Sequence, residues 1–277
     1  MQRISLLILI LALSTECNFQ EHIINSTALN NDKKIKNTSS EIESYTRYKS
    51  RAIIQALKNR KDLSPGEAIV LISSYLINIP HINSRLQGQK SKQEELIIDF
   101  RQMDYLSYLA YLKALQLSLN TDDFIHNVIK VRYINSYMSV YNRKHFFTDW
   151  ATLRYKLAND MTSRLSCHTL TVKKILNKKE NGEYYFPGLP CIHRNITYIP
   201  GQFIDNSLLG KLQPGDFIGI YSQLAGQDIS DAGIYVPTDN GPMFRHLAPA
   251  GGQRRVVDTP FIASLSQTPG IIILRSQ

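Results

Sequence analysis

Residues 99–119 read DFRQMDYLSYLAYLKALQLSL, and most of this stretch has the pattern of a buried helix. Its leucines recur at the three- and four-residue spacing of one helix face: Leu106, Leu109, Leu112, Leu115 and Leu119. Aspartate is a favoured N-cap residue, so we expect Asp104 to cap a helix that Tyr105 enters. The stretch therefore predicts a helix over residues 104–119.

Helical patterns also lie on both sides of this stretch. Apolar residues share one face over residues 41–57 and again over residues 122–131. Between them, Ser64, Pro65 and Glu67 combine an N-cap, a first-turn proline and the glutamate of a capping box. The sequence therefore predicts several helices before residue 132.

The second half of the chain has a different pattern. Short β-branched or aromatic runs are separated by Gly, Pro, Asn and Asp. We expect strands or extended segments at residues 172–176, 184–186, 195–199, 217–221, 232–236 and 271–274. Helices followed by strands predict an α+β fold with segregated elements and not a βαβ repeat.

The first residues have the features of an export signal. A positive start precedes an apolar run that is too short to cross a bilayer, which takes about 20 residues. We expect a signal peptide at residues 1–17, a flexible linker at 18–40 and a single domain at 41–277. A lipoprotein anchor on Cys17 is the competing hypothesis, and Glu16 before it disfavours that anchor. The predicted location is periplasmic or secreted.

The composition excludes some partners and favours others. The formal net charge of +9 favours anionic surfaces such as wall polymers or lipid head groups. The basic residues are scattered, and no zinc-finger or aromatic-glycine RNA-binding pattern occurs, so nucleic acid is not a predicted partner. The seven histidines show no paired spacing, so no metal or cofactor is predicted, and no later apolar run predicts a transmembrane segment.

The chain has three cysteines: Cys17, Cys167 and Cys191. If Cys17 is removed with the signal or anchored, Cys167 and Cys191 remain as a pair. Disulfides form in oxidising, exported locations, so a bond between these two is one hypothesis. Two free thiols are the other.

Five blocks of sequence occur in an order that resembles one family. They are residues 99–104 (DFRQMD), 129–150 (ending NRKHFFTDW), 198–218 (YIP and LQPGDFI), 226–234 (GQDISDAGI) and 270–275 (GIIILR). Together they resemble the N-acetylmuramoyl-L-alanine amidase-like branch of the papain-like, NlpC-type cell-wall cysteine hydrolases. The resemblance covers most of residues 65–275. It implies N-terminal helices, including the helix of the nucleophile, packed on a C-terminal antiparallel sheet or half-barrel.

The resemblance also implies a catalytic arrangement that this chain has altered. The family places a cysteine at a helix N-terminus, a histidine on a strand and a third polar group that orients the histidine. Tyr105, Asp231 and His246 stand at those positions here. A tyrosine hydroxyl, with a reference pKa of about 10, is little ionised at neutral pH, and an aspartate, with a reference pKa of about 3.9, cannot serve as a general acid unless its pKa is strongly raised. We therefore predict a degenerate site in which a Tyr105–Asp231 hydrogen bond is structural.

The resemblance places Asp104, Arg143, His145 and Trp150 along a substrate groove. Each has a structural alternative. Asp104 is also a helix cap, Trp150 a core residue, and Arg143 a partner for an ion pair with Asp149. For His145 and His246, no candidate nucleophile is evident nearby, and for His246 we favour the interpretation as a surface or loop histidine.

Three functions remain open. The first is an exported, catalytically degenerate bacterial protein that binds peptidoglycan, muropeptides or a protein partner. The second is an active peptidoglycan hydrolase with an atypical Tyr-Asp site, since tyrosine is a known nucleophile in some glycosidases. The third is a secreted interaction protein directed at a host or rival.

Overall fold

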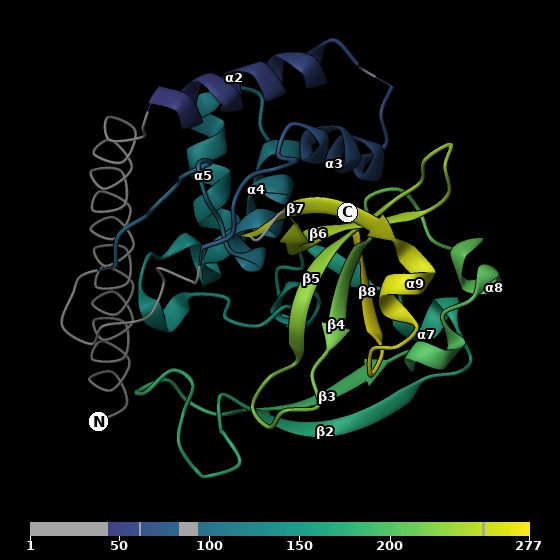
Figure 1. Ribbon diagram of the computed structural model, residues 1–277. Helices are drawn as coiled ribbons and strands as arrows, with labels where there is room; N and C mark the ends of the chain where they lie inside the picture. Colours follow the sequence, from purple (N-terminus) through teal and green to yellow (C-terminus); the bar gives the residue numbers. More distant parts are fainter. Residues whose placement is uncertain (1–43, 61, 83–93, 251–252) are drawn as a thin grey trace, which may run out of the picture. The chain divides into compact units, whose positions relative to one another are not determined.

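The computed structural model describes residues 44–60, 62–82, 94–250 and 253–277, all within the unit Ile42–Gln277. The predicted signal peptide (1–17) and linker (18–40) lie outside these residues. The described chain combines helices with an antiparallel sheet, and the longer helices precede most of the strands (Figure 1). The predicted α+β class is therefore confirmed.

The longer helices come first in the chain. They are α2 (Ser44–Lys58), α3 (Pro65–Ser74), α4 (Tyr105–Gln116) and α5 (Thr121–Arg132). The short ones are α6 (Asp149–Thr152), α7 (Thr162–Leu165), α8 (Asn206–Leu209) and α9 (Phe261–Leu265), with 3₁₀ turns η1 (Ile134–Ser136), η2 (Val140–Asn142) and η3 (Gly201–Phe203).

Two predicted helix starts are confirmed by their caps. The Ser64 side chain accepts from the backbone N–H of Glu67, and the Glu67 carboxylate accepts from the N–H of Ser64. The Asp104 carboxylate accepts from the N–H of Ser107 at 2.8 Å. Helix α4 ends at Gln116, earlier than predicted, and Leu119 is 71% exposed.

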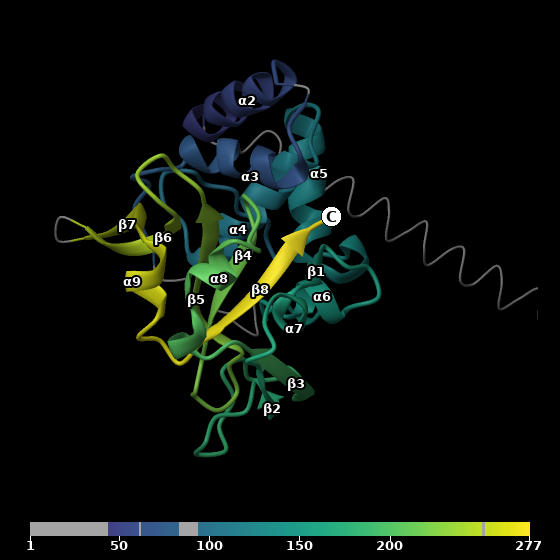
Figure 2. The ribbon, with the colours of Figure 1, turned by 90° about the vertical axis from the view of Figure 1, so that its right-hand side faces the viewer.

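The main sheet is antiparallel, with six strands in the order β1-β8-β4-β5-β6-β7. Its strands are β1 (Ala158–Asp160), β4 (Phe217–Tyr221), β5 (Ile229–Val236), β6 (Met243–Ala250), β7 (Gln253–Pro260) and β8 (Ile271–Ser276). A separate two-stranded sheet pairs β2 (Leu170–Leu176) with β3 (Ile192–Tyr198). Figure 2 shows this hairpin below the main sheet.

The prediction of a strand at residues 184–186 is wrong. These residues belong to the loop between β2 and β3, where Tyr184 makes an isolated bridge with Lys178. The side chain of Asn177 accepts from the N–H of Phe186 and donates to the carbonyls of Phe186 and Leu189. Hydrogen-bonding groups of the loop backbone thus pair with the buried side-chain amide of Asn177 instead of with a neighbouring strand.

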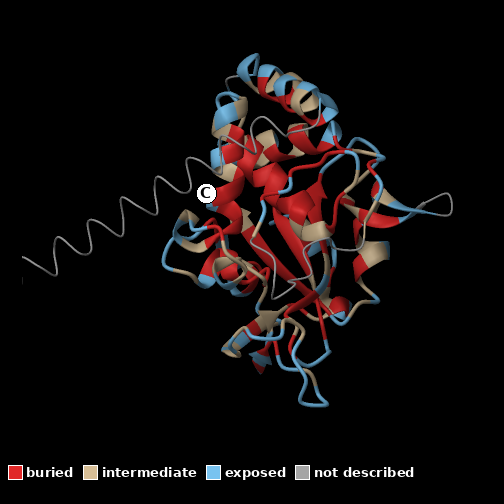
Figure 3. Cartoon of the chain, turned by 90° about the vertical axis from the view of Figure 1, so that its left-hand side faces the viewer, coloured by how far each residue is buried: buried red, intermediate tan, exposed pale blue. Residues whose placement is uncertain are grey.

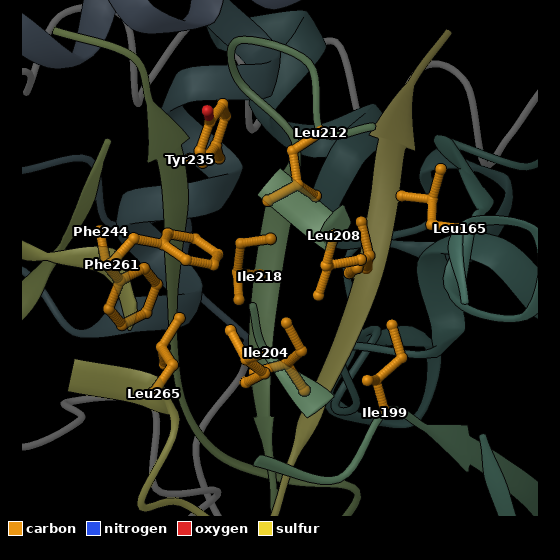
Figure 4. Packing of buried hydrophobic residues seen from close by; sticks show 12 residues of the cluster. Leu165, Ile199, Ile204, Leu208, Leu212, Ile218, Tyr235, Phe244, Phe261 and Leu265 are labelled. Atoms are coloured by element: carbon orange, nitrogen blue, oxygen red, sulfur yellow. The ribbon is translucent and has the colours of Figure 1, made fainter. Parts of the chain in front are cut away.

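Buried side chains from the sheet and the short helices form one apolar cluster (Figure 4). Phe244 of β6 meets Phe261 of α9, and Ile218 of β4 lies near Leu208 of α8. Helix α4 packs against β5, and most of its residues are buried. Figure 3 shows that buried residues gather at the centre of the described chain. The N-terminus of α4 is therefore held next to the sheet.

The hairpin register corrects the disulfide hypothesis. Leu170 pairs with Tyr198 and Leu176 with Ile192, so Cys167 and Cys191 flank opposite ends of the hairpin. Seven residues at about 3.3 Å each span roughly 20 Å, whereas a disulfide requires Cα atoms within about 7 Å. Accordingly, both are free cysteines in the structure.

Two partly or fully buried lysines predict how stability changes with pH. Lys113 donates to Ser276 and to the carbonyl of Gln277, and Lys144 donates to the carbonyls of Val131 and Tyr133. Burial lowers the pKa of each ammonium to about 8 from the usual 10.5. Between these values the unfolded chain binds more protons than the folded chain. The free energy of unfolding therefore rises with pH in that window.

We expect the gain between pH 8 and 9.5 to be on the order of 1 kcal/mol per lysine. Urea unfolding at half-unit pH steps measures it. The Lys113→Met variant should show a shallower rise than the unaltered protein. An unfolding free energy that falls across this interval in both proteins would contradict the prediction.

Candidate functional site

The N-terminus of α4 carries the first part of the site. Asp104 caps the helix, and Tyr105 is its first residue. Burial raises the pKa of the Tyr105 hydroxyl far above its usual value of 10, and the charges of Asp228, Asp104 and Asp231 raise it further. Each factor opposes ionisation, so Tyr105 is a neutral phenol at physiological pH.

Three neighbouring strands carry the second part. Asp231 of β5 lies 3.4 Å from Nδ1 of His246 on β6, and Nε2 of His246 lies 3.2 Å from the hydroxyl of Thr259 on β7. Ser264 of α9 donates to the same hydroxyl at 2.7 Å. Phe244 stacks against the His246 ring at 4.1 Å. The imidazole is therefore fixed at both nitrogens and on one face.

This geometry corrects the expected Tyr105–Asp231 hydrogen bond. Within the described residues, the side-chain partners of Asp231 are His246 and Arg254, whose Nη2 donates to it at 3.1 Å. A hydrogen bond from a guanidinium to a carboxylate is stronger than one from a neutral phenol such as Tyr105, because the guanidinium is always charged. Asp231 influences Tyr105 only through its charge.

A second carboxylate near Tyr105 is fully buried. Asp228 accepts from the N–H and the hydroxyl of Thr148, at 2.8 and 2.9 Å, and from the N–H of Ile229. Arg194 of β3 donates to the Thr148 hydroxyl at 2.7 Å and pairs with Asp149 at 2.8 Å. Burial raises the pKa of Asp228, and the Thr148 bonds oppose that rise.

Arg143 and Asp149 do not pair with each other, which corrects that alternative. Arg143 donates to both oxygens of Glu94 at 2.6 Å, and Tyr133 donates to the same carboxylate. Asp149 pairs instead with Arg194. Arg143 is thus held in an ion pair with Glu94, and the two side chains are only 10% and 8% exposed.

Trp150 and His145, which the resemblance places along a substrate groove, have structural contacts. Trp150 is buried and packs edge-on against Phe217 at 5.2 Å. The His145 ring contacts Phe186 at 4.4 Å, and its Nε2 lies 2.8 Å from the carbonyl of Val140. Burial lowers the pKa of His145, so its imidazole is neutral.

The sequence did not single out two residues at the site, His81 and Arg254. The N–H of His81 bonds to the carbonyl of Arg254, and His81 bridges Met103, next to Asp104. Burial and then Arg254 lower the pKa of His81, while Asp104 and Asp231 act in the opposite direction. No local motif marks either residue, because strand pairing alone brings them together.

Two further features bear on ligands. Among the residues that the structure describes, no three His, Cys, Asp or Glu side chains are grouped so as to hold a metal ion. Within the same residues, no helix combines the length and apolar character needed to cross a bilayer.

Solved structures share this fold. Protein LPG0564 from Legionella pneumophila, of the DUF1460 family, superposes with a TM-score of 0.71 at 22% identity, covering 86% of this chain and 96% of its own. An N-acetylmuramoyl-L-alanine amidase from Bacteroides uniformis gives 0.63 at 21% identity, covering 77% and 99%. At such identities the likeness establishes the fold alone. Among functionally curated proteins, none matches this sequence.

The sequence itself gives the family. A family model described as AmiA-like, N-acetylmuramoyl-L-alanine amidase-like, matches residues 71–271, which is more than half of the chain and includes Tyr105, Asp231 and His246. The chain belongs to the AmiA-like, N-acetylmuramoyl-L-alanine amidase-like family.

Proposed function

We propose that this protein is an exported, peptidoglycan-binding member of its family that has lost the family's cysteine chemistry. Membership of the family supports a peptidoglycan-related role. The papain-like resemblance supports the assignment of the nucleophile and histidine positions to Tyr105 and Asp231. The observation that carries the proposal is the neutral, half-buried Tyr105 where the reactive thiol is expected.

A tyrosine-dependent hydrolase is the less favoured function. Attack by Tyr105 requires a phenolate, and burial together with three carboxylates disfavours that ion. Asp231 is also a poor base, because it already accepts from His246 and Arg254. Both arguments concern proton transfer, so they leave ligand binding unaffected.

Polar groups around Tyr105 support retention of a ligand site. Asp231, His246 and Arg254 form a connected set, and the Arg254 side chain is 46% exposed. A guanidinium anchored by Asp231 and by the Leu247 carbonyl is preorganised to donate to a ligand oxygen. Preorganised donors reduce the entropic cost of binding.

The test uses the purified full chain and insoluble peptidoglycan. Co-sedimentation measures binding, and chromatography of the supernatant measures released stem peptide. We expect binding without release, and the same result for Tyr105→Phe. Arg254→Gln should weaken binding roughly 5- to 10-fold, since it removes a charged donor.

Release that disappears in Tyr105→Phe would replace this proposal with the tyrosine-dependent hydrolase. Release that survives that change but disappears in Thr259→Val would assign the chemistry to the Asp231–His246–Thr259 chain of hydrogen bonds. Absence of both binding and release would favour a protein partner instead, the third hypothesis.

A further inference from the structure

Helix α2 carries positive charge that no acidic residue of the helix balances. Between Ser44 and Lys58 there is no aspartate or glutamate, and there are four basic residues: Arg47, Lys49, Arg51 and Lys58. In the whole chain, by contrast, 32 Lys and Arg stand against 23 Asp and Glu. A helix whose charges all have one sign attracts anionic partners.

One face of α2 is fixed against the rest of the described chain. Thr46, Ser50, Ile53 and Ile54 are buried. The Thr46 hydroxyl accepts from the N–H of Phe100 at 3.0 Å, which ties the helix to the segment before α4. Figures 1 and 2 both show α2 at the edge, with α3, α4 and α5 on one side of it. The apolar side of the helix is therefore used within the protein.

The opposite face of α2 is exposed to solvent. Tyr48, Arg51, Gln55 and Lys58 recur at three- and four-residue spacing, so they form one stripe along the helix, and all four are exposed. From Tyr48 to Lys58 the stripe is about 15 Å long. Within the described part of the chain, no carboxylate pairs with Arg51 or Lys58. These two charges are available to an external anion.

Two tyrosines accompany the charges. Tyr48 is 73% exposed and Tyr45 is 41% exposed. The ammonium of Lys49 donates to the Tyr45 hydroxyl at 2.9 Å and lies 5.2 Å from the centre of its ring. Tyrosine combines an apolar ring with a polar tip, and such side chains gather where a membrane meets water. Basic and aromatic side chains on one helix thus match a layer of anionic lipid head groups.

We propose that the outer surface of α2, defined as Tyr45, Tyr48, Lys49, Arg51 and Lys58, docks on a membrane surface rich in anionic phospholipid. The apolar residues of the helix pack inside the protein, so α2 lies on the head groups and does not insert deeply. Each basic side chain held near such a surface strengthens binding roughly fivefold, and salt weakens the attraction. The inference goes beyond the proposed function and does not depend on it.

Other polyanions are the competing partners of this surface. A nucleic acid duplex or an acidic polymer would also attract its basic side chains. An exposed Tyr48 within the basic stripe favours a head-group layer, because there the ring and the hydroxyl meet apolar and polar surroundings at once. Lipid is therefore the occupant that these residues fit best.

The test measures partition of the full chain onto vesicles by co-sedimentation. One set of vesicles contains equal amounts of phosphatidylglycerol and phosphatidylcholine, and the other contains phosphatidylcholine alone. The quantity compared is the ratio of the two partition coefficients, because the apolar run near the N-terminus contributes to both. Arg51→Gln combined with Lys58→Gln should lower this ratio roughly 10- to 30-fold. Glutamine is a good helix former, so circular dichroism should show an unchanged helix content.

Matched controls come from the segment after α6. Arg154 and Lys156 are exposed, and Tyr155 between them is 70% exposed. Arg154→Gln combined with Lys156→Gln removes the same two kinds of charge outside α2, and it should leave the ratio nearly unchanged. Tyr48→Ala should weaken binding to the anionic vesicles, whereas Tyr155→Ala should not.

The outcomes separate this inference from its alternatives and from the proposed function. Equal losses in the α2 double variant and its control would overturn the assignment to α2, because the net charge of the whole chain would then explain binding. A ratio near one for the unaltered protein would overturn the lipid assignment, and binding to duplex DNA in that case would identify another polyanion. If the α2 double variant keeps its vesicle ratio but loses sedimentation with peptidoglycan, α2 serves wall binding instead. A lowered vesicle ratio with unchanged sedimentation would support the membrane surface independently of the proposed function.

Discussion

Arg194→Met is expected to lower the free energy of unfolding by about 3–5 kcal/mol. The Arg194 and Asp149 side chains are only 10% and 7% exposed and lie 2.8 Å apart. Removing the guanidinium leaves the Asp149 carboxylate buried and uncompensated. It also removes the donor at 2.7 Å to Thr148, which itself bonds to the buried Asp228. The effect therefore reaches Asp228, whose charge acts on Tyr105.

The control for Arg194→Met lies in the loop next to β3. Lys179 pairs with Glu183 at 3.1 Å, but these side chains are 36% and 64% exposed. Lys179→Met should change the unfolding free energy by less than about 1 kcal/mol, because water screens an exposed pair. Urea unfolding of both variants gives the comparison, and losses of equal size would refute the argument from burial.

A double variant tests the cause of this loss. Asn at position 149 removes the charge but keeps an acceptor for the N–H of Phe146, which the Asp149 carboxylate accepts at 3.0 Å. Adding Asp149→Asn to Arg194→Met should therefore recover a substantial part of the lost stability. No recovery would mean that the loss comes from packing of the arginine side chain and not from the unpaired charge.

Local signals in the sequence located the helices because their caps are local structures. The capping box of Ser64 and Glu67 and the cap at Asp104 each join residues three positions apart. Leucines continue beyond Gln116 with helical spacing, so the pattern predicts that the helix ends at residue 119, whereas α4 ends at Gln116. Asn120 instead caps α5, so the chain must leave the helix before it.

Strands β6 and β7 could not be predicted, because tertiary contacts make their charged residues suitable for a sheet. Arg245 of β6 is buried, and it pairs with Asp258 of β7 at 2.6 Å and donates to Ser73 at 2.7 Å. Without knowledge of these partners, a stretch containing Arg, His and two Pro does not suggest a strand. Strand preference here depends on the neighbours and not on the segment itself.

The site was predictable only where family resemblance supplied the alignment. Tyr105, Asp231 and His246 were assigned in that way, and the structure brings Asp231 beside His246. Arg254 competes for Asp231, and it was missed because its position follows from the pairing of β6 with β7. The expected Tyr105–Asp231 bond is absent because Arg254 bonds to Asp231, and no local motif in the sequence marks Arg254.

Restoring the family's residues is expected to create a reactive thiol. The variant combines Tyr105→Cys with Asp231→His and keeps His246 as the third polar group. The thiol would lie at the N-terminus of α4, where the helix dipole favours the thiolate, and the new histidine would accept its proton. The variant with Tyr105→Cys alone keeps Asp231, whose negative charge near this position disfavours a thiolate. The double variant should therefore react with iodoacetamide at pH 6 roughly 10- to 100-fold faster than the single variant.

Mass-resolved labelling distinguishes the introduced thiol from the native Cys17, Cys167 and Cys191, and the unaltered protein gives their background. Faster labelling accompanied by release of stem peptide would indicate that substitution at these two positions is what removed the chemistry. Faster labelling without release would assign the defect to substrate positioning, for which Arg254 is the first candidate because it now bonds to Asp231. Equal labelling of the single and double variants would contradict the prediction. In that case Asp104 and the buried Asp228, which also disfavour an anion at this position, would dominate the electrostatics of the site.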